Sequence, residues 1–445
     1  MYQSDRRKSA SRPTRRGFLK KAAAGAAVLG LADGVHAAGS DIIRVGMIGC
    51  GGRGTDAAAQ ALTAGRDVRL VAMCDVFRDR IENARRRLVG QFPGQVAVDD
   101  DHCFTGLDGY RHAIASSDVV LIACASKFHP MYTEEAVRAG RHVFVEKPHG
   151  IDPAGVRRMK AACDLAAAKK LSVVSGLHSR FDAGYRETIR RVHDGAIGDI
   201  VAIQCLFLRA PYAVVLPDPA WSEMEYQFRN WYHFCWLSGD DVSQSLVHNL
   251  DRASWALREE QPVWAFGLAG RSASFGRPFG DMFDHHTVVY EYAGGRRLYA
   301  MCRTQVDCYH NYSDVIMGTR GICHLFDMRI EGENPWKYEG QVPDPREAEQ
   351  RALIEAVREG RPIHSGYHMC DSTMIAVLGQ IACYSGKYTT LKECWESDFG
   401  FGPAPEEVSL DMAPPVRPDE SGNYPLPRPG ITGLPLRPPP ATATA

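Results

Sequence analysis

The sequence predicts an α/β protein: an N-terminal Rossmann domain with a doubly wound parallel sheet, then a C-terminal α+β domain with a large, mostly antiparallel sheet. Between residues 41 and 150, short apolar runs alternate with helix-forming segments, which is typical of parallel strands joined by crossover helices. A glycine-rich turn at 49–54 follows the first of these runs. After about residue 175 the pattern changes, and a glycine turn at 293–295 between two apolar runs predicts a β-hairpin.

The first 38 residues are interpreted as an address rather than a part of the fold. Arg15 and Arg16 precede an alanine-rich apolar segment at 22–32, and small residues at 35–37 provide a cleavage point. This pattern predicts a twin-arginine signal over 1–38 and a periplasmic or otherwise exported protein. The apolar segment is too short to cross a bilayer as a helix, so we expect no stable membrane span.

The glycine-rich turn predicts a dinucleotide site because of what surrounds it. Residues 42–48 have the apolar character of a buried parallel strand and 56–62 favour a helix, so the glycines lie at a strand-to-helix turn. Gly49 would allow the tight turn, Gly51 the close approach of a pyrophosphate, and Gly54 close packing of helix on strand. The helix N-terminus would add N–H groups and a partial positive charge. The predicted cofactor-binding residues of this turn are Gly49, Gly51, Gly52, Arg53 and Gly54.

Asp75 ends the next apolar run, 68–74, at about the distance expected for the carboxylate that binds the ribose. A carboxylate there favours the free 2′-hydroxyl of NAD and repels the 2′-phosphate of NADP, so NAD is the expected cofactor. Arg78 is the one neighbour that weakens this preference. Because NAD is made in the cytoplasm, an exported protein would need to fold around its cofactor first and then hold it tightly.

Two predicted domains divide the body of the chain: a NAD-binding Rossmann domain over 41–175, and an α+β domain for substrate binding and oligomerisation over 176–401. The strands and helices expected within them lie at 118–124, 131–138, 142–145, 153–170, 185–193, 200–207, 286–292, 296–301, 346–358 and 371–384. The segment 402–445 is rich in proline and poor in large apolar residues, so it cannot form a core of its own. It is either a disordered tail or an extended arm laid across a partner subunit.

The composition argues against several other functions. The formal net charge of −1 gives no indication of a nucleic-acid-binding protein. The 13 cysteines are odd in number and lack metal-like or disulfide-framework spacing, so we interpret them as small buried hydrophobes. Asp284, His285 and His286 are consecutive, but neighbours on a strand point to opposite faces, and we therefore predict no metal site.

Four segments carry a resemblance that covers most of residues 41–400. They are the glycine turn 49–54, residues 125–129 after a predicted strand, the Glu-Lys-Pro sequence that closes another strand at 146–148, and residues 239–251. Together they resemble the Gfo/Idh/MocA (glucose–fructose oxidoreductase / inositol dehydrogenase) family, and Glu-Lys-Pro is the most specific of them. The resemblance implies a NAD-dependent oxidoreductase acting on CH–OH groups, and a homo-oligomer built through the faces of the second-domain sheets.

The resemblance assigns catalytic roles to Lys147 and His248. By it, Lys147 lies near the nicotinamide ribose and the reacting hydroxyl, where an ammonium would stabilise a developing alkoxide. His248 would be the acid/base group that alcohol oxidation needs. The alternative for His248 is a buried structural histidine, because Leu246 and Leu250 flank it. The further cofactor-binding residues that the resemblance implies are Ser126, His129, Glu146 and Lys147.

Gln244 departs from the pattern of the family, which usually has a carboxylate four residues before this histidine. Positions i and i+4 share one face of a helix, so the side chains of Gln244 and His248 are expected to meet. Gln can hold an imidazole by a hydrogen bond but cannot ionise, so His248 should be a weaker base. Lys147 would then take the proton, or another acid would substitute, or dehydrogenation would be slow or absent. The acids considered as substitutes are Asp240, Asp241 and Asp251.

Residues 228–236 are unusually aromatic, which favours contact with the apolar C–H faces of a sugar. The alternative is a core or subunit contact. Polar side chains would bind the hydroxyls, and the arginines could bind either hydroxyls or a carboxylate. The predicted substrate-binding residues are Arg180, Asn230, Trp231, Gln244 and Arg303.

Three functions remain open from the sequence. The first is an exported NAD-dependent oxidoreductase that acts on a carbohydrate or polyol hydroxyl with a tightly held cofactor. The second is a NAD-dependent glycosidase or lyase of the same family that works by transient oxidation and elimination. The third is a non-catalytic sugar-binding protein. In each case the expected partner is a small-molecule sugar or glycoside.

Overall fold

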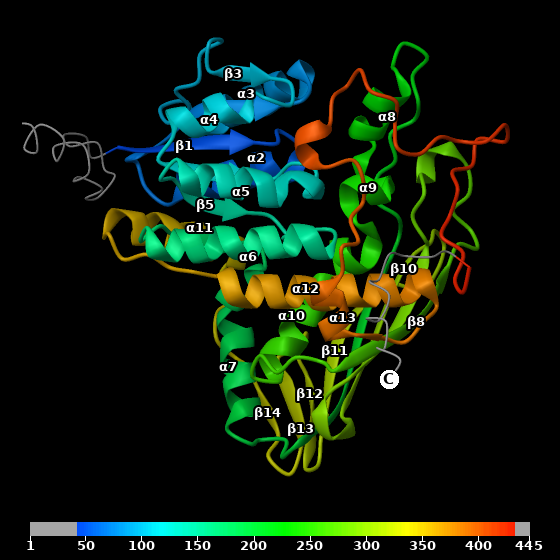
Figure 1. The fold of residues 1–445 in the computed structure, drawn as a ribbon. Coiled ribbons are helices and arrows are strands. Elements are labelled where there is room, and N and C mark those ends of the chain that lie inside the picture. The colour runs from blue at the N-terminus through cyan, green and yellow to red at the C-terminus, as the bar shows by residue number, and fades with distance from the viewer. Residues whose placement is uncertain (1–41, 432–445) are drawn as a thin grey trace, which may run out of the picture. The chain divides into compact units, whose positions relative to one another are not determined.

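Six parallel strands form the first sheet, in the order β3-β2-β1-β4-β5-β6 (Figure 1). The computed structural model describes residues 42–431, so the predicted twin-arginine signal lies outside the described residues. The strands are β1 (Ile43–Ile48), β2 (Val68–Asp75), β3 (Cys103–Thr105), β4 (Val119–Ile122), β5 (His142–Val145) and β6 (Val173–Ser175). The strand order reverses at β1, whose two neighbours are β2 and β4. Such a switch point opens a crevice at the carboxyl ends of the strands.

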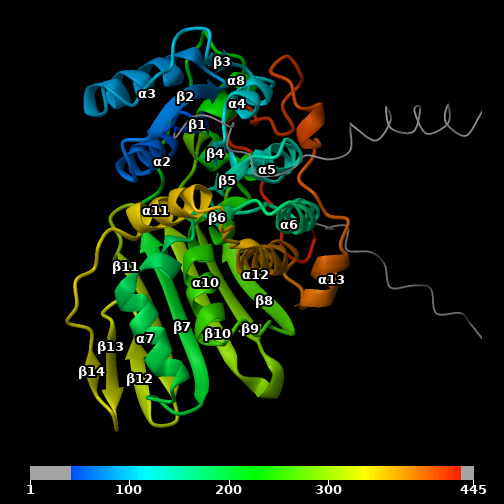
Figure 2. The same ribbon diagram turned by 90° about the vertical axis from the view of Figure 1, so that its left-hand side faces the viewer.

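Helices cover both faces of this sheet. Those that follow its strands are α2 (Gly52–Thr63), α3 (Arg78–Gln91), α4 (Tyr110–Ser116), α5 (His129–Arg138) and α6 (Pro153–Ala168). The apolar residues of α2 and α3 form one core with Val45 and Met47 of β1, while those of α4, α5 and α6 join the opposite core with Ile48. The helix α11 (Pro345–Arg358), far along the chain, also packs against α2 (Figure 2). The predicted doubly wound sheet is therefore confirmed.

Nine strands form the second sheet, in the order β14-β13-β12-β11-β7-β10-β9-β8-β15. They are β7 (Ile200–Arg209), β8 (Trp264–Gly270), β9 (His285–Glu291), β10 (Arg297–Thr304), β11 (Asn311–Gly318), β12 (Gly321–His324), β13 (Arg329–Gly332), β14 (Trp336–Lys337) and β15 (Thr389–Thr390). All neighbouring strands are antiparallel except β7 and β10, which are parallel. The mostly antiparallel sheet and the β9–β10 hairpin are as the sequence predicts.

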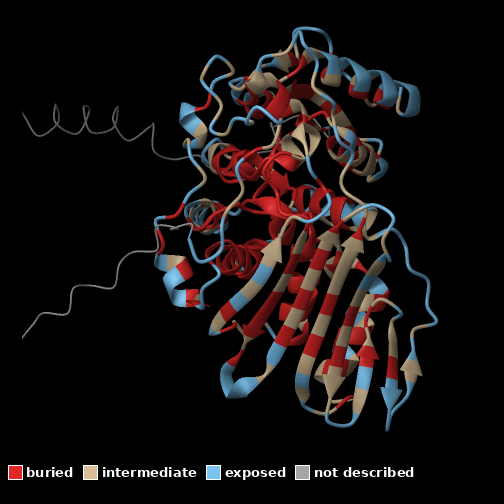
Figure 3. Cartoon of the chain, turned by 90° about the vertical axis from the view of Figure 1, so that its right-hand side faces the viewer, coloured by how far each residue is buried: buried red, intermediate tan, exposed pale blue. Residues whose placement is uncertain are grey.

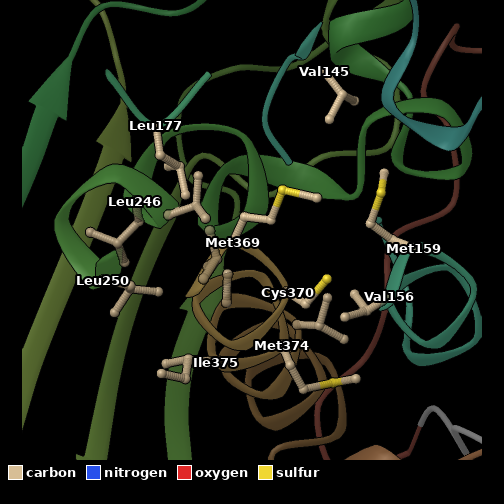
Figure 4. Packing of buried hydrophobic residues seen from close by; sticks show 14 of the residues in the cluster. Val145, Val156, Met159, Leu177, Leu246, Leu250, Met369, Cys370, Met374 and Ile375 are labelled. Carbon is tan, nitrogen blue, oxygen red and sulfur yellow. The ribbon is translucent and has the colours of Figure 1, made fainter. Parts of the chain in front are cut away.

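Helices pack on one face of the second sheet, and within residues 42–431 the other face carries no helix (Figures 2 and 3). The remaining α-helices are α7 (Ala183–His193), α8 (Glu223–Arg229), α9 (Cys235–Ser238), α10 (Val247–Ala256), α12 (Gly366–Ser385) and α13 (Leu391–Glu396). The helix α12 is buried along nearly its whole length because it lies between α6, α10 and the sheet. Met369 and Ile375 of α12 belong to the same hydrophobic core as Leu246 and Leu250 near the start of α10 (Figure 4). A helix that is apolar on all sides is expected in such a position.

Residues 402–431 follow neither of the two alternatives that the sequence suggested for the proline-rich tail. This part of the tail is laid over its own chain. Tyr424 is 3% exposed, its ring lies 5.0 Å from that of Phe234, and its hydroxyl donates to Glu223. Upstream, the carbonyl of Val416 accepts a hydrogen bond from the side chain of Gln227. A proline-rich segment needs no core of its own when it fills grooves on an existing one.

Two further sequence-based interpretations concern the body of the chain. The thirteen cysteines, all within the described residues, form no disulfide, and eleven of them are buried. This agrees with their interpretation as small hydrophobic side chains. Over residues 42–431, none of the helices combines the length and the apolar character needed to cross a membrane.

Candidate active site

The glycine-rich turn between β1 and α2 leaves open space over the first turn of α2. Gly49 has a φ of 95°, in the left-handed region that favours glycine. A Cβ on Gly54 would lie 1.9 Å from the carbonyl oxygen of Gly49, so only glycine permits this packing. A Cβ on Gly52, by contrast, would have no neighbour within 4 Å. A pyrophosphate fits such a cradle, because the free N–H groups of a helix N-terminus bind phosphate oxygens.

A pocket of about 610 Å³, part of it open to solvent, lies beside this turn and is called the nucleotide pocket below. Its walls come from the carboxyl ends of β1, β2 and β4, which is the position predicted by the strand order. Asp75 projects into it from the end of β2. The carboxylate of Asp75 accepts hydrogen bonds from the backbone N–H groups of Cys50 (2.7 Å) and Phe77 (3.0 Å). Burial nevertheless raises the pKa of Asp75 above its ordinary value.

The arginine beside Asp75 is Arg80 rather than Arg78. Arg78 pairs with Glu82 and Asp100 and does not line the pocket, so the expectation that it weakens the preference for NAD is wrong. Arg80 does line the pocket and donates to the backbone carbonyl of residue 229. The two arginines are two residues apart in α3 and so point to opposite sides of the helix, and the sequence alone did not show which of them turns toward the pocket.

A second pocket of about 590 Å³, called the reaction pocket below, adjoins the nucleotide pocket. The two pockets share Ala123, Cys124 and Trp231 in their walls. The other residues that line the reaction pocket are Arg53, His129, Glu146, Lys147, Gly176, His178, Tyr232, His248 and Arg346. The fold thus brings together residues that are up to about 300 positions apart, and both predicted catalytic residues are among them.

Arg53 and Glu146 form an ion pair in the wall of the reaction pocket, with 2.5 Å between Nε and Oε1. Burial acts to raise the pKa of Glu146, but the positive charges of Arg53 and Lys147 outweigh it and lower the pKa. Glu146 is therefore an anion whose charge Arg53 balances. A second carboxyl, that of Glu349, lies 3.4 Å from Arg53, but burial and the charge of Glu146 raise its pKa well above the ordinary value.

Lys147 reaches from the end of β5 toward the start of α10. Its Nζ donates to the backbone carbonyl of Gln244 at 2.7 Å, and its backbone N–H donates to Glu146 at 3.1 Å. The ammonium therefore has only a neutral partner within hydrogen-bond distance and keeps two N–H groups for another acceptor.

His248 stands half-buried in the first turn of α10 with an unpartnered ring nitrogen. Its Nδ1 has no hydrogen-bond partner among the described residues, and its ring centroid lies 5.3 Å from that of His178. Burial lowers the pKa of His248 well below its ordinary value, and the charges of Lys147, Arg252 and Arg346 and the nearby His178 lower it further. The imidazole is consequently neutral at neutral pH.

None of the three acids considered as substitutes for the missing carboxylate contacts His248. Asp240 accepts from the hydroxyl of Tyr384 at 2.6 Å. Asp241 pairs with Arg209, and Asp251 pairs with Arg180. Each of these carboxylates is bound within the fold, so no acid in the described residues orients His248.

Gln244 does not meet His248 either, which corrects the expectation drawn from helical spacing. Residues Val242–Leu246 form a π-helix, whose i→i+5 hydrogen bonds shift the faces that an α-helix would align. The side-chain amide of Gln244 instead donates to Ser126 Oγ (2.7 Å) and to the carbonyl of Ser238 (2.6 Å). Being 1% exposed, Gln244 cannot bind substrate with that side chain, although its carbonyl positions Lys147.

Two of the predicted cofactor residues, Ser126 and His129, are held by the fold. Ser126 is fully buried against Gln244 and lines neither pocket, which contradicts its assignment to the cofactor. His129 does line the reaction pocket. Its two ring nitrogens lie 2.8 and 3.1 Å from the carbonyl oxygens of Pro148 and Cys124, so it braces the loops that follow β4 and β5.

Of the predicted substrate residues, only Trp231 lies in the pockets. Its ring stacks on Tyr232 with 3.9 Å between centroids. The assignment of Asn230 to substrate binding is wrong, because its side-chain amide accepts a hydrogen bond from the backbone N–H of Val215 and donates one to the backbone carbonyl of Pro278.

The two predicted substrate arginines are also placed elsewhere. Arg180 is bound by the carboxylates of Asp251 and Glu259, which leaves no free face on its guanidinium. Arg303 follows the alternation of β10 onto the sheet face opposite the buried Cys302 and Thr304, away from the helices and both pockets. Both assignments are therefore corrected.

Sequence reasoning missed several residues that line the pockets, among them Arg80, His178, Tyr232 and Arg346. His178 follows the carboxyl end of a parallel strand, β6, which is a signal that could have found it. Tyr232 belongs to the aromatic segment that the sequence singled out. Arg346 carries no local signal, because its helix joins the site from the far end of the chain.

Comparison with known proteins gives a consistent result. Residues 43–175 match the family described as "Oxidoreductase family, NAD-binding Rossmann fold". Inositol 2-dehydrogenase of Gluconacetobacter diazotrophicus is 27% identical to this chain over 336 residues, which covers 72% of the chain and 87% of that protein. Inositol 2-dehydrogenase of Rhizobium meliloti is 24% identical over 65% of the chain and 72% of that protein.

Solved structures share the fold. The crystal structure of myo-inositol 2-dehydrogenase from Lactobacillus plantarum has a TM-score of 0.60 and 20% identity, covering 78% of this chain and 99% of that one. GenD2 from gentamicin A biosynthesis, crystallised in complex with NAD, has a TM-score of 0.58 and 17% identity, covering 78% of this chain and 96% of that one.

Proposed function

Because the chain belongs to the Gfo/Idh/MocA family of NAD-binding Rossmann oxidoreductases, we propose that it oxidises a hydroxyl of a polyol or carbohydrate with NAD. One observation carries the proposal. Lys147 follows β5 of the first sheet, and His248 lies in α10, which packs on the second sheet. Both line a pocket that shares three wall residues with the nucleotide pocket. A substrate there would lie against the end of a dinucleotide bound along the glycine turn.

The chain's own groups would handle the proton and the charge. When bound, the nicotinamide supplies a hydride acceptor. The neutral imidazole of His248 has a free nitrogen that can accept the hydroxyl proton, and its low pKa makes it a weak base. The ammonium of Lys147 offsets this weakness, because a cation near the substrate oxygen stabilises the developing alkoxide. The Arg53–Glu146 pair holds the wall between the glycine turn and β5.

We propose that the cofactor is NAD rather than NADP because of the position of Asp75. Its carboxylate is fixed at the end of β2, where it would accept the ribose hydroxyls and repel a 2′-phosphate. Arg80 lies in the same pocket and works against this preference. Titration of nucleotide-free protein with both dinucleotides tests the assignment, and tighter binding of NADP would overturn it.

We also propose that the protein is exported through the twin-arginine route with its cofactor in place. The support is the sequence pattern over 1–38, together with the cytoplasmic origin of NAD. Protein recovered from the periplasm of its host should carry nucleotide after extensive dialysis. Recovery of the full chain from the cytoplasm alone would refute export, and loss of nucleotide on dialysis would refute tight binding.

We also propose that the protein forms a homo-oligomer in which subunits meet at the helix-free face of the second sheet, because that face exposes large apolar side chains. Phe266 is 40% exposed, Ile322 39% and Leu268 72%, and all three lie on that face by the alternation of their strands. Large apolar side chains on an open sheet are typical of a subunit interface. Light scattering should give a multiple of the chain mass, and L268E should reduce it. A monomeric wild-type protein would contradict this proposal.

The experiment for the central proposal is a single-turnover titration. Protein purified with its own nucleotide is mixed with a panel of polyols and sugars, beginning with myo-inositol, and the near-ultraviolet band of reduced nicotinamide is followed. Growth of that band with one sugar class is expected, and K147M and H248N should suppress it while retaining nucleotide. Tight sugar binding without any spectral change would instead favour a non-catalytic protein.

A second candidate, a glycosidase or lyase, is favoured by the pair of neighbouring imidazoles. Oxidation at one carbon would acidify the adjacent C–H bond, and elimination would then expel the leaving group and leave a double bond. Water would add across that bond in a glycosidase, whereas a lyase would keep it, and return of the hydride would restore the alcohol. Such a scheme needs a base for the O–H proton and another for the C–H proton. His248 and His178, with ring centroids 5.3 Å apart, could provide both. Release of an aglycone without net change in bound nucleotide would distinguish this candidate.

A further inference from the structure

Two short loops that follow neighbouring strands supply part of the wall of the reaction pocket. Glu146 and Lys147 follow β5, and Gly176 and His178 follow β6. Because β5 and β6 pair in parallel up to their carboxyl ends, the two loops leave the sheet side by side. A Cβ on Gly176 would lie 2.7 Å from Oε1 of Glu146, so the loops pack closely on each other. The place of Lys147 in the pocket therefore depends on what holds these loops.

His149, two residues after Lys147, connects both loops to the helix α12. It is fully buried and lines neither pocket. Its backbone N–H donates to Oγ1 of Thr373 at 3.3 Å, and its ring Nδ1 lies 3.0 Å from the same oxygen. Its Nε2 lies 2.9 Å from Oγ of Ser175, which also accepts the backbone N–H of Leu177 in the second loop at 3.1 Å.

The imidazole of His149 is well matched to these two hydroxyls. Burial lowers its pKa to about 3, so the ring is neutral at neutral pH and has one donor and one acceptor nitrogen. The hydroxyls of Ser175 and Thr373 can each donate or accept, so both nitrogens have a partner. A shift of either loop would leave a buried polar group unpaired, which costs free energy. The bonds of His149 therefore oppose movement of the loops.

The residue next to Thr373 holds the element that carries the other predicted catalytic group. Oγ of Ser372 donates to Oδ1 of Asp251 at 2.9 Å. Asp251 lies about one helical turn after His248 in α10, and Ser372 and Thr373 are both fully buried. Consecutive residues of one buried helix thus bond to the loop that carries Lys147 and to the helix that carries His248.

We propose that His149, Ser372 and Thr373 are positioning residues that fix the distance between Lys147 and His248. The inference rests on the proposed oxidoreductase function, in which the ammonium and the imidazole must meet the same hydroxyl. None of the three residues lines either pocket, so they act through the groups that they hold. Misplacement of a reacting group by about 1 Å can lower turnover by about 100-fold.

The test removes one hydroxyl at a time. T373V keeps the shape of the side chain but loses both contacts with His149. It should lower kcat about tenfold for the fastest substrate of the panel described above, with less than about a twofold change in KM and in NADH affinity. T373S restores the hydroxyl and should recover most of kcat. S372A should lower kcat by less than T373V, because Arg180 still pairs with Asp251.

The matched control is T188V. Thr188 is fully buried in α7, donates to the carbonyl of Gly184 at 2.7 Å and lies outside both pockets. T188V therefore also removes a buried, hydrogen-bonded hydroxyl from a helix, and it should destabilise the protein to a similar extent as T373V while keeping the kcat of wild type.

The outcomes separate this inference from the proposed function. Wild-type kcat in T373V or in S372A would overturn the inference and leave the oxidoreductase standing. An equal loss of kcat in T373V and T188V would show only a general loss of stability, and it too would overturn the inference.

If no sugar reduced the nucleotide, the proposed function would fail, and the reactivity of Lys147 would decide the inference separately. Trace acetylation by acetic anhydride, followed by mass spectrometry of the peptide that contains Lys147, needs no substrate. Lys147 should react about threefold faster in T373V than in wild type or T188V, because its loop is no longer tied to α12. Equal rates in the three proteins would overturn the inference.

Discussion

Replacing Gln244 by Glu restores the residue type usual in the family, yet the structure predicts that Q244E will damage the protein. The amide of Gln244 donates at 2.7 Å to Ser126 Oγ and at 2.6 Å to the carbonyl of Ser238. The hydroxyl of Ser126 can turn and donate to a carboxylate, but the carbonyl of Ser238 cannot. A glutamate would therefore face an acceptor at hydrogen-bond distance in a site that is 1% exposed.

The magnitude follows from these contacts. The carboxylate keeps a donor in Ser126 but loses the hydrogen bond to Ser238, which is worth about 1 kcal/mol, and burial of the charge adds about 3 kcal/mol, so the expected loss is about 4 kcal/mol at pH 8. Such burial raises the folded-state pKa of the new carboxyl above its unfolded value by about two units. Its contribution is therefore harmless below about pH 4, where the acid is protonated in both states. It becomes destabilising as pH rises from the unfolded-state pKa to the folded-state pKa, and the loss is complete above the latter.

The assay is urea unfolding followed by tryptophan fluorescence at several pH values, with Q244M as the control. Methionine removes both hydrogen bonds without adding a charge, so its loss of about 2 kcal/mol should not depend on pH. Q244E should show the pH-dependent loss, together with no gain in turnover. A Q244E protein as stable as wild type at pH 8, with faster turnover, would show that this side chain reaches His248 and would refute the reasoning.

Three further predictions follow from the same structure. The D75N variant should bind NADH 10- to 100-fold more weakly in a fluorescence titration, because a charge-assisted hydrogen bond to ribose is lost; a change below twofold would contradict this. Burial lowers the pKa of both His178 and His233 to about 4. Each histidine therefore lowers the unfolding free energy as pH falls below about 6.5, where the unfolded chain takes up the proton first, and the loss is about 2 kcal/mol at pH 5. H233Q should show a smaller drop in unfolding free energy between about pH 7 and pH 5 than wild type, and an equal drop would count against this prediction. The Y424A variant should lose about 2–4 kcal/mol in urea unfolding, because the ring that packs on Phe234 is removed, whereas an unchanged midpoint would show that the arm is not bound in solution.

The cofactor half of the site was predictable because its signals are local. The strand, the glycine turn and the helix at 42–63 are contiguous in the chain, and Gly49 and Gly54 each have a steric reason in the backbone. Asp75 ends β2 and Lys147 lies just beyond β5, and both strands belong to the same parallel sheet, so their carboxyl ends meet at one edge of that sheet. A residue at the end of a predicted parallel strand can therefore be placed at that edge of the sheet from the sequence.

The substrate half depends on contacts between distant segments. Asn230, Arg180 and Arg303 have the right chemistry for a sugar, but their partners or their sheet face remove them from the pocket, and no pattern in the sequence shows those partners. Gln244 fails for a subtler reason, because a π-helical turn changes which side chains share a face.

The sequence by itself determined the two sheets and the position of the glycine-rich turn, and the family resemblance implied that Lys147 and His248 share one site. Hydrophobic periodicity and glycine sterics act over a few residues, so they can be followed along the chain. Only the tertiary structure decided which charges the pocket presents. It buries the carboxylates of Asp240, Asp241 and Asp251 against other partners, and it brings Arg346 from the far end of the chain to the pocket wall. Electrostatic balance is a property of the whole packed neighbourhood, and it exists only once that neighbourhood has formed.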